Sequence, residues 1–187
     1  MEREGPTKHV NLWMDSTDFA VRGTSSKGKK DDYHSYKLNS LGRRYQFILD
    51  GKMVVRALWG GYSPKIHDSN WCEANRQTLE RDFKGGVIIA DQHFEKISNM
   101  MKAPRFITPQ KVSEPPQTDN PDDMRPEVRE KLERNKKVRQ VRARVELAFG
   151  ILEKKFKILS KKFADGPAQL DHLVTFAAGV LNTLHDN

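Results

Sequence analysis

The sequence predicts an α/β fold in which a mixed β-sheet is flanked by helices. Short apolar runs come early in the chain and are joined by hairpin-like turns, which is typical of an antiparallel meander. Later runs alternate with helical patterns, and this alternation predicts strands covered by helices. At 187 residues, the chain is long enough for one compact domain with a substantial core. We expect this domain to cover residues 9–185.

A first strand is predicted close to the N-terminus. Residues 9–14 form a short apolar run, and the turn-forming residues 15–18 should end it. Residues 23–32 are rich in Ser, Gly and Lys, which indicates a loop. An extended segment is expected at residues 36–39.

The next part of the chain predicts a β-hairpin. Residues 45–49 have an extended pattern, and the Asp50-Gly51 pair that follows is a strong hairpin signal. Gly51 can take the positive φ that a type I′ turn requires. We therefore expect the returning strand at residues 52–59, with Gly60-Gly61 ending it.

The middle of the chain predicts a helix and then a buried strand. Asp68 and Ser69 provide N-cap chemistry for a helix over residues 70–83. Residues 87–90 are continuously apolar, as in a central strand, and this strand should end at Asp91. A short helix and an extended segment should follow, at residues 94–101 and 105–108.

The C-terminal third predicts an exposed loop and two amphipathic helices. A proline-rich loop or insertion is expected at about residues 109–134. The long helix after it has an apolar stripe at intervals of three or four residues, formed by Val138, Val141, Val145, Phe149, Leu152, Phe156 and Leu159. After Gly166-Pro167, a last helix has a similar stripe, formed by Leu170, Leu173, Val174, Ala177, Ala178, Leu181 and Leu184.

Composition limits the compartment and the partners. Cys72 is the only cysteine, which excludes an internal disulfide and favours a reducing, intracellular environment. No stretch has the pattern of a signal peptide or a membrane span. The net charge is +8, and residues 129–162 hold thirteen Lys and Arg against four Glu, a local balance of +9. A basic excess gathered in one segment indicates a polyanionic partner such as DNA.

Three carboxylates stand where metal chemistry would place them. Asp15 and Asp91 each follow an apolar run, and ligands commonly bind beyond the ends of strands in α/β sheets. Glu146 follows Val145 of the apolar stripe, at the border of the face expected to pack on the sheet. Gathered carboxylates repel one another unless a hard cation such as Mg²⁺ or Mn²⁺ neutralises them. An ordinary i, i+4 ion pair with Arg142 would explain Glu146 equally well.

Four short motifs occur in an order that resembles the Harbinger-like DDE transposase nucleases. They are Asp15-Ser16-Thr17, the segment from Gly60 to Ser69, Ile89-Ala90-Asp91, and the segment from Arg142 to Gly150. The closing segment from Leu181 to Asn187 is also similar, so the resemblance covers nearly the whole chain. The chain departs from the family at Ser16, where Gly is common, and in its long proline-rich loop.

The resemblance implies a ribonuclease-H-like fold and a nuclease that hydrolyses or transfers phosphodiester bonds of DNA. Asp15, Asp91 and Glu146 match the three metal-binding acids, which would hold two divalent ions, Mg²⁺ or Mn²⁺. His67 is a candidate accessory residue, although a lone His is more often structural. Asp68 and Ser69 of the same motif are adequately explained as a helix cap.

The basic helix gives this nuclease a way to hold DNA. Phosphates beside the metal site could be bound by Lys136, Lys137, Arg139, Arg142 and Arg144. The same run of charge favours nuclear localisation. No segment before residue 9 is long enough for a DNA-reading domain, so we expect target choice to come from a missing N-terminal region or a separate DNA-binding partner protein.

Two other functions compete with the nuclease. A domesticated, catalytically idle domain would use the same surface to bind DNA or a protein, and the presence of all three acids argues against it. A phosphohydrolase of the haloacid dehalogenase type would need a second Asp two residues after Asp15. Thr17 stands at that position, which disfavours this reading.

Overall fold

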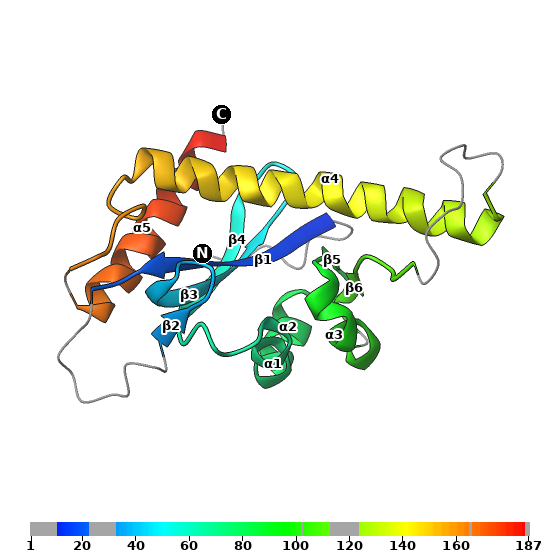
Figure 1. The fold of residues 1–187 in the computed structure, drawn as a ribbon, viewed down its shortest axis with the longest axis horizontal. Helices are drawn as coiled ribbons and strands as arrows, with labels where there is room; N and C mark the ends of the chain where they lie inside the picture. The colour runs from blue at the N-terminus through cyan, green and yellow to red at the C-terminus, as the bar shows by residue number, and fades with distance from the viewer. Residues whose placement is uncertain (1–10, 23–32, 102, 113–123, 165, 186–187) are drawn as a thin grey trace.

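The fold is a mixed sheet between two layers of helices, as the sequence predicted. The computed structural model describes residues 11–22, 33–101, 103–112, 124–164 and 166–185. The long helix α4 (Pro126–Lys155) and helix α5 (Pro167–His185) lie on one side of the sheet in Figure 1. Helices α1 (Asp68–Ala74), α2 (Arg76–Asp82) and α3 (Glu95–Met100) lie on the other side.

The sheet has the strand order β4-β3-β1-β5-β6, and β2 pairs with the start of β3. The strands are β1 (Asn11–Ala20), β2 (His34–Ser35), β3 (Ser40–Leu49), β4 (Val55–Tyr62), β5 (Val87–Ile89) and β6 (Arg105–Ile107). The first part is an antiparallel meander, β1-β3-β4. Strand β5 is parallel to both β1 and β6. The short helix η2 (Gln92–Phe94) leads from β5 into α3.

Each face of the sheet has its own apolar core. Side chains alternate along a strand, so Trp13 packs beneath α4 and α5, whereas Leu12 and Met14 pack against the α1–α3 layer. On α4, Val138, Val145 and Leu152 are buried, as the stripe predicted. The alternation on β1 decides which face each later residue of the strand occupies.

Strand β1 is longer than predicted and runs through Asp15. The prediction that residues 15–18 end it was wrong, because β1 pairs with β3 from Trp13 to Ala20. Its parallel pairing with β5 covers only residues 11–13. A distant partner strand therefore extends β1 beyond the point that local turn signals indicated. Residues 9–10 and the predicted loop at 23–32 lie outside the described residues.

Residues 36–39 form a turn rather than the predicted extended segment. The backbone N–H of Leu38 donates to the Ser35 hydroxyl at 3.2 Å, and Asn39 has a φ of 46°. The hairpin after β3 is present, but its positive φ falls on Met53 (63°) and not on Gly51. The Asp50 carboxylate accepts the backbone N–H groups of Lys52 and Val54 and closes this longer turn.

Strand β4 continues through the two glycines that were expected to end it. The Tyr45 ring lies directly over Gly60, where a side chain would clash with it, and Gly61 has a φ of 75°. These glycines therefore allow close packing within the strand. The single predicted helix at 70–83 is two helices, because the chain breaks at Asn75, whose side chain donates to the Trp71 carbonyl at 2.8 Å.

Helix α4 begins earlier and ends earlier than predicted. Residues 126–134, which were assigned to the proline-rich loop, form its first turns, and Pro126 suits this position because a first-turn N–H has no helical partner. Residues 113–123 of that loop lie outside the described part of the chain. The helix ends at Lys155, so Phe156 caps it and Leu159 is buried beyond it.

Candidate metal and nucleic-acid site

Asp15 and Asp91 lie at the point where β1 and β5 separate. The last paired residues of these parallel strands are Trp13 and Ile89, and each aspartate comes two residues later. Trp13 and Ile89 both contact the core beneath α4. Alternation therefore directs the two carboxylates toward the same helix, at the open end of the strand pair.

The groups around Asp15 have opposing effects on the pKa of its carboxyl group. Burial raises the pKa of Asp15 above its ordinary value of 3.8, and the nearby Asp91 carboxylate also raises it. The backbone N–H of Ser16, which donates to Asp15 Oδ1 at 2.8 Å, lowers this pKa, as do the charges of Lys37 and Arg142. Two carboxylates and two cations thus act on one another at this site.

Asp91 also caps the short helix η2. Its Oδ1 accepts the backbone N–H of His93 at 2.7 Å. This is the local role that the sequence allowed for an aspartate after a strand. The cap fixes the carboxylate beside the end of β5 through Oδ1, and no hydrogen bond joins Oδ2 to another of the described residues.

Glu146 lies outside the pair formed by Asp15 and Asp91. Its side chain is 64% exposed, and its Oε1 lies 3.7 Å from Arg142 Nη2 in an i, i+4 ion pair. This is the alternative that the sequence left open. No three His, Cys, Asp or Glu side chains of the described residues gather closely enough to hold a metal ion. The predicted convergence of all three acids is therefore not observed.

The chemistry of the Asp15–Asp91 pair nevertheless fits a hard divalent cation. Both ligands would be carboxylate oxygens, which Mg²⁺ and Mn²⁺ prefer. A bound cation would favour the charged form of Asp15, which burial and, to a smaller extent, Asp91 disfavour. The charge of Arg142 lowers the pKa of Asp15, and Arg142 also forms the ion pair with Glu146. Glu146 is therefore one helical turn from a residue that lies near Asp15 and Asp91.

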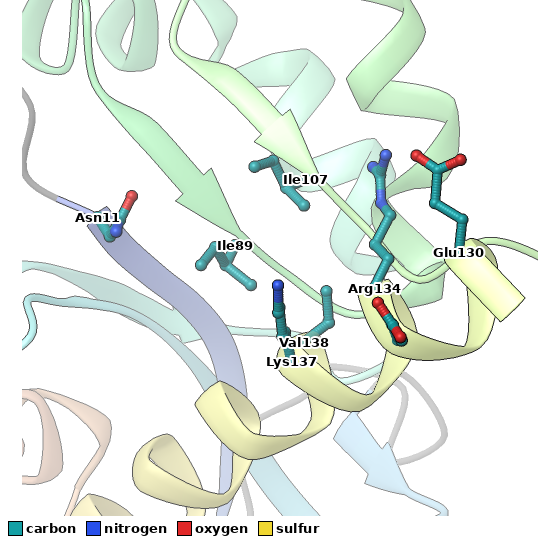
Figure 2. A pocket seen from close by; sticks show the side chains of 8 residues that line it. Asn11, Ile89, Ile107, Glu130, Arg134, Lys137 and Val138 are labelled. Carbon is teal, nitrogen blue, oxygen red and sulfur yellow. The ribbon is translucent and has the colours of Figure 1, made fainter. Parts of the chain in front are cut away.

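Two basic residues of α4 lie beside the parallel strands β1 and β5, and two others are exposed. Arg144 lies over the Trp13 ring, with its Cζ 5.5 Å from the ring centroid. Lys137 lines a pocket of about 420 Å³, whose apolar wall includes Ile89 and Val138 (Figure 2). Lys136 and Arg139 are exposed.

Arg142 differs from these lysines and arginines in its surroundings. Its Nε is buried and has no hydrogen-bond partner among the described residues. A buried donor without an acceptor is costly unless something supplies one. Within the predicted basic set, Arg142 is thus distinguished by a buried donor that the described residues leave without an acceptor.

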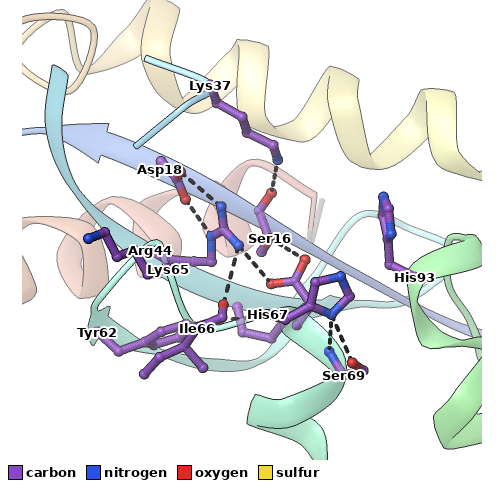
Figure 3. Close-up of polar contacts among 12 residues, drawn as sticks. Ser16, Asp18, Lys37, Arg44, Tyr62, Lys65, Ile66, His67, Ser69 and His93 are labelled. Carbon is purple, nitrogen blue, oxygen red and sulfur yellow. Dashed lines mark hydrogen bonds and ion pairs between the residues drawn. The ribbon is translucent and has the colours of Figure 1, made fainter. Parts of the chain in front are cut away.

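His67 is the N-cap of α1, which corrects the expectation that Asp68 and Ser69 form the cap. Its Nδ1 accepts the backbone N–H of Ser69 at 3.4 Å and lies 2.8 Å from the Ser69 hydroxyl. Its ring meets that of His93 edge to face at 5.3 Å (Figure 3). His67 therefore contacts the segment that follows Asp91 while it stabilises a helix end.

A buried polar network occupies the opposite face of β1. Arg44 binds Asp18 through two hydrogen bonds, of 2.7 and 3.1 Å, and reaches Asp68 at 3.4 Å. Ser16 donates to Asp68 at 3.0 Å, and Ser35 donates to Asp18 at 2.6 Å. Because Asp68 accepts from both Arg44 and Ser16, the network ties β1 and β3 to the start of α1.

Sequence reasoning missed two members of this region, Lys37 and Arg44. Lys37 lies in the turn that was predicted to be extended. Arg44 lies next to the predicted strand at 45–49 and carried no local signal of its partner. The sequence offered one hint of Arg44. Asp18 lies three residues after Asp15, and if the strand had been expected to continue, a buried Asp18 would have required a cationic partner.

The fold is a mixed α/β sheet flanked by helices, and two carboxylates lie where its central parallel strands separate. This arrangement is consistent with a ribonuclease-H-like fold. Residues 14–182 match the model of the DDE superfamily endonucleases. The chain therefore belongs to this family of transposase-type nucleases, which have a ribonuclease-H-like fold, act on phosphodiester bonds of DNA and typically use divalent metals.

Comparisons with curated proteins and with solved structures gave no match. Within the described residues, no helix is both long and apolar enough to cross a membrane.

Proposed function

We propose that this chain is a Harbinger-like, divalent-metal-dependent DNA endonuclease that hydrolyses or transfers phosphodiester bonds. The observation that carries the proposal is the placement of Asp15 and Asp91 just beyond the point where β1 and β5 separate, beneath a basic helix. Membership of the family supplies the class of reaction. The nuclease domain would cover residues 9–185.

Asp15, Asp91 and Glu146 would hold the metal, which we propose to be two Mg²⁺ or Mn²⁺ ions. Bound there, the metal would make a water or 3′-hydroxyl oxygen more nucleophilic and stabilise the leaving oxygen. Glu146 would join the two aspartates by turning away from Arg142. That ion pair is exposed, and such pairs contribute only about 0–1 kcal/mol, so it opposes the movement weakly.

DNA would bind along α4. Lys136, Lys137, Arg139, Arg142 and Arg144 would contact phosphates, so the attraction would be salt-dependent and largely independent of sequence. Release of Glu146 to the metal would leave the Arg142 guanidinium available to a phosphate. Metal and DNA would then support each other's binding through the Arg142–Glu146 pair.

A second candidate is a domesticated, catalytically idle domain that binds DNA or a protein through the same surface. The observation in its favour is that Glu146 is exposed and paired with Arg142. If that pairing persists when metal is present, the third ligand is missing and cleavage fails. Both candidates place the protein in the nucleus, with a separate DNA-binding protein to choose the target.

Two variants of α4 test the proposal. Glu146→Gln keeps the shape but removes a charge from the metal site, so metal-dependent nicking of plasmid DNA should fall by orders of magnitude while metal-free DNA binding holds or rises. The double variant with Arg142→Ala and Arg144→Ala should instead weaken binding to unrelated sequences and flatten its salt dependence by about one unit per lost phosphate contact.

The wild-type chain is the reference for both variants, with folding checked by circular dichroism. Nicking by Glu146→Gln at the wild-type rate would remove Glu146 from the metal site. A wild-type chain that binds DNA but never nicks it with Mn²⁺ would favour the idle domain.

A further inference from the structure

Lys37 lies beside the carboxylate pair, although it belongs to neither of the motifs that contain Asp15 and Asp91. Its Nζ donates to the backbone carbonyl of Ser16 at 3.2 Å (Figure 3). Its charge lowers the pKa of Asp15, the residue before Ser16. The ammonium group is therefore held next to the first predicted metal ligand.

The turn that carries Lys37 is fixed by the buried network on the far face of β1. Ser35 donates to Asp18 and accepts the backbone N–H of Leu38, so the turn is tied to Asp18 on one side of Lys37 and closed on the other. Asp18 is itself held by Arg44. The network thus fixes the backbone position from which the Lys37 side chain extends.

The ammonium group keeps binding capacity for a ligand. An ammonium has three donors, and the hydrogen bond to Ser16 uses one of them. Lys37 forms no ion pair with another of the described residues, so Asp15 is near it without capturing it. A phosphate that approached Asp15 and Asp91 would meet two negative charges, and a neighbouring cation with free donors would reduce that repulsion.

We propose that Lys37 binds a non-bridging oxygen of the DNA phosphate that is brought to Asp15 and Asp91. The inference rests on the proposed nuclease function, because it assumes that DNA enters at the carboxylate pair. Lys37 would be a substrate-contacting residue, contributed by the turn after β2 and facing the basic residues that α4 contributes. DNA would then be held between this turn and the helix.

Binding measurements on the full chain separate Lys37 from a general basic residue. Lys37→Met should lower the salt slope of short-duplex binding by about one unit, measured without metal, because one phosphate contact is lost. Lys37→Arg keeps the charge and should keep the slope. Lys84→Met is the matched control, because Lys84 is an exposed lysine in another turn, and its slope should equal that of the wild type.

Titration with Mn²⁺ alone provides a second readout. Removing the neighbouring positive charge in Lys37→Met should tighten Mn²⁺ binding by up to about fivefold, whereas Lys84→Met and Lys37→Arg should leave it unchanged. A wild-type salt slope in Lys37→Met, or an equal loss in Lys84→Met, would overturn the proposal. Failure of the nuclease function is distinguished by Asp15→Asn: if that variant binds Mn²⁺ as the wild type does, the metal site is wrong, whatever the salt slopes show.

Discussion

Asp15 and Asp18 lie three residues apart on β1 and have opposite surroundings. Asp18 points to the α1 face, is 4% exposed, and its two oxygens accept hydrogen bonds from Arg44 and Ser35. Asp15 points toward α4, accepts a backbone N–H from Ser16, and has a second carboxylate, Asp91, close by. Asp18 is paired directly with Arg44, whereas Asp15 has Lys37 and Arg142 near it but forms no ion pair with another described residue.

This difference separates a structural carboxylate from a functional candidate. A buried charge persists when partners balance it, and Asp18 has such partners. A buried carboxylate that has a second carboxylate nearby and no ion pair among the described residues, as Asp15 has, indicates a site where a ligand is expected to supply the balance. Neutralising Asp15 should therefore affect a different property of the protein from neutralising Asp18.

The largest expected effect is on cleavage. Asp15→Asn removes one charge from the carboxylate pair, and metal-dependent DNA nicking should fall by at least about 100-fold, the scale of losing one electrostatic catalytic contact. The chain should remain folded and should still bind DNA without metal. Plasmid nicking assays with Mn²⁺ measure this effect. Cleavage by Asp15→Asn at the wild-type rate would show that Asp15 is not a metal ligand.

The next largest effect is on stability, at the other aspartate. Asp18→Ala leaves the Arg44 guanidinium, 13% exposed, without its main partner, which should lower the free energy of unfolding by about 3–5 kcal/mol. Urea denaturation measures this change. Glu73→Ala is the control, since it removes an exposed partner of Lys96 and should cost less than about 1 kcal/mol. Equal losses in the two variants would show that the Asp18–Arg44 pair contributes no more to stability than an exposed ion pair.

Substitution of Asp15 should change stability in the opposite direction from substitution of Asp18, because Asp15→Asn should stabilise the fold. Its pKa is raised by burial and by Asp91, so the folded chain retains a proton that the unfolded chain releases. Stability therefore falls as the pH rises from the ordinary value of 3.8 through the raised pKa. Asp15→Asn lacks this charge, so its Tm should exceed that of the wild type at neutral pH, and the difference should shrink below pH 3.8.

Thermal melts without metal at both pH values measure that difference. Mn²⁺ should then raise the Tm of the wild type more than that of Asp15→Asn, because only the intact pair binds it well. A variant that is less stable than the wild type at neutral pH would indicate that Asp15 has a structural role like that of Asp18.

The sequence predicted the layers of the fold, because they depend on local apolar runs and their order. It also predicted that Asp15, Asp91 and Glu146 converge, and of these the structure brings Asp15 and Asp91 near one another. The sequence failed where distant contacts decide. The pairing of β1 with β3 carries the strand past Asp15, and the Asp18–Arg44 bond joins residues 26 apart in the sequence. Lys37 reaches Ser16 for the same kind of reason, since a turn fixed by tertiary hydrogen bonds has no periodic signature.

Glu146 shows the limit of helical periodicity. The pattern placed it correctly beside the buried Val145, at the edge of the packed stripe. Rotation about its side-chain bonds then decides between Arg142 and the aspartates, and periodicity carries no information about rotamers. The i, i+4 spacing favours the ion pair when no cation competes for the carboxylate.

The smallest effect concerns His67, which contacts His93 near the carboxylate pair yet caps α1 on the network side. His67→Ala removes the acceptor for the Ser69 N–H and should cost about 1 kcal/mol of stability, measured by urea denaturation. His67→Asn supplies another good capping side chain and should recover most of that loss. If capping is the only role of His67, the Asn variant should also nick DNA at the wild-type rate. A stable Asn variant with reduced nicking would instead assign His67 to the site, because the cap is restored while the imidazole is absent. The two variants therefore decide whether His67 belongs only to the structural network around Asp18 or also to the candidate site around Asp15 and Asp91.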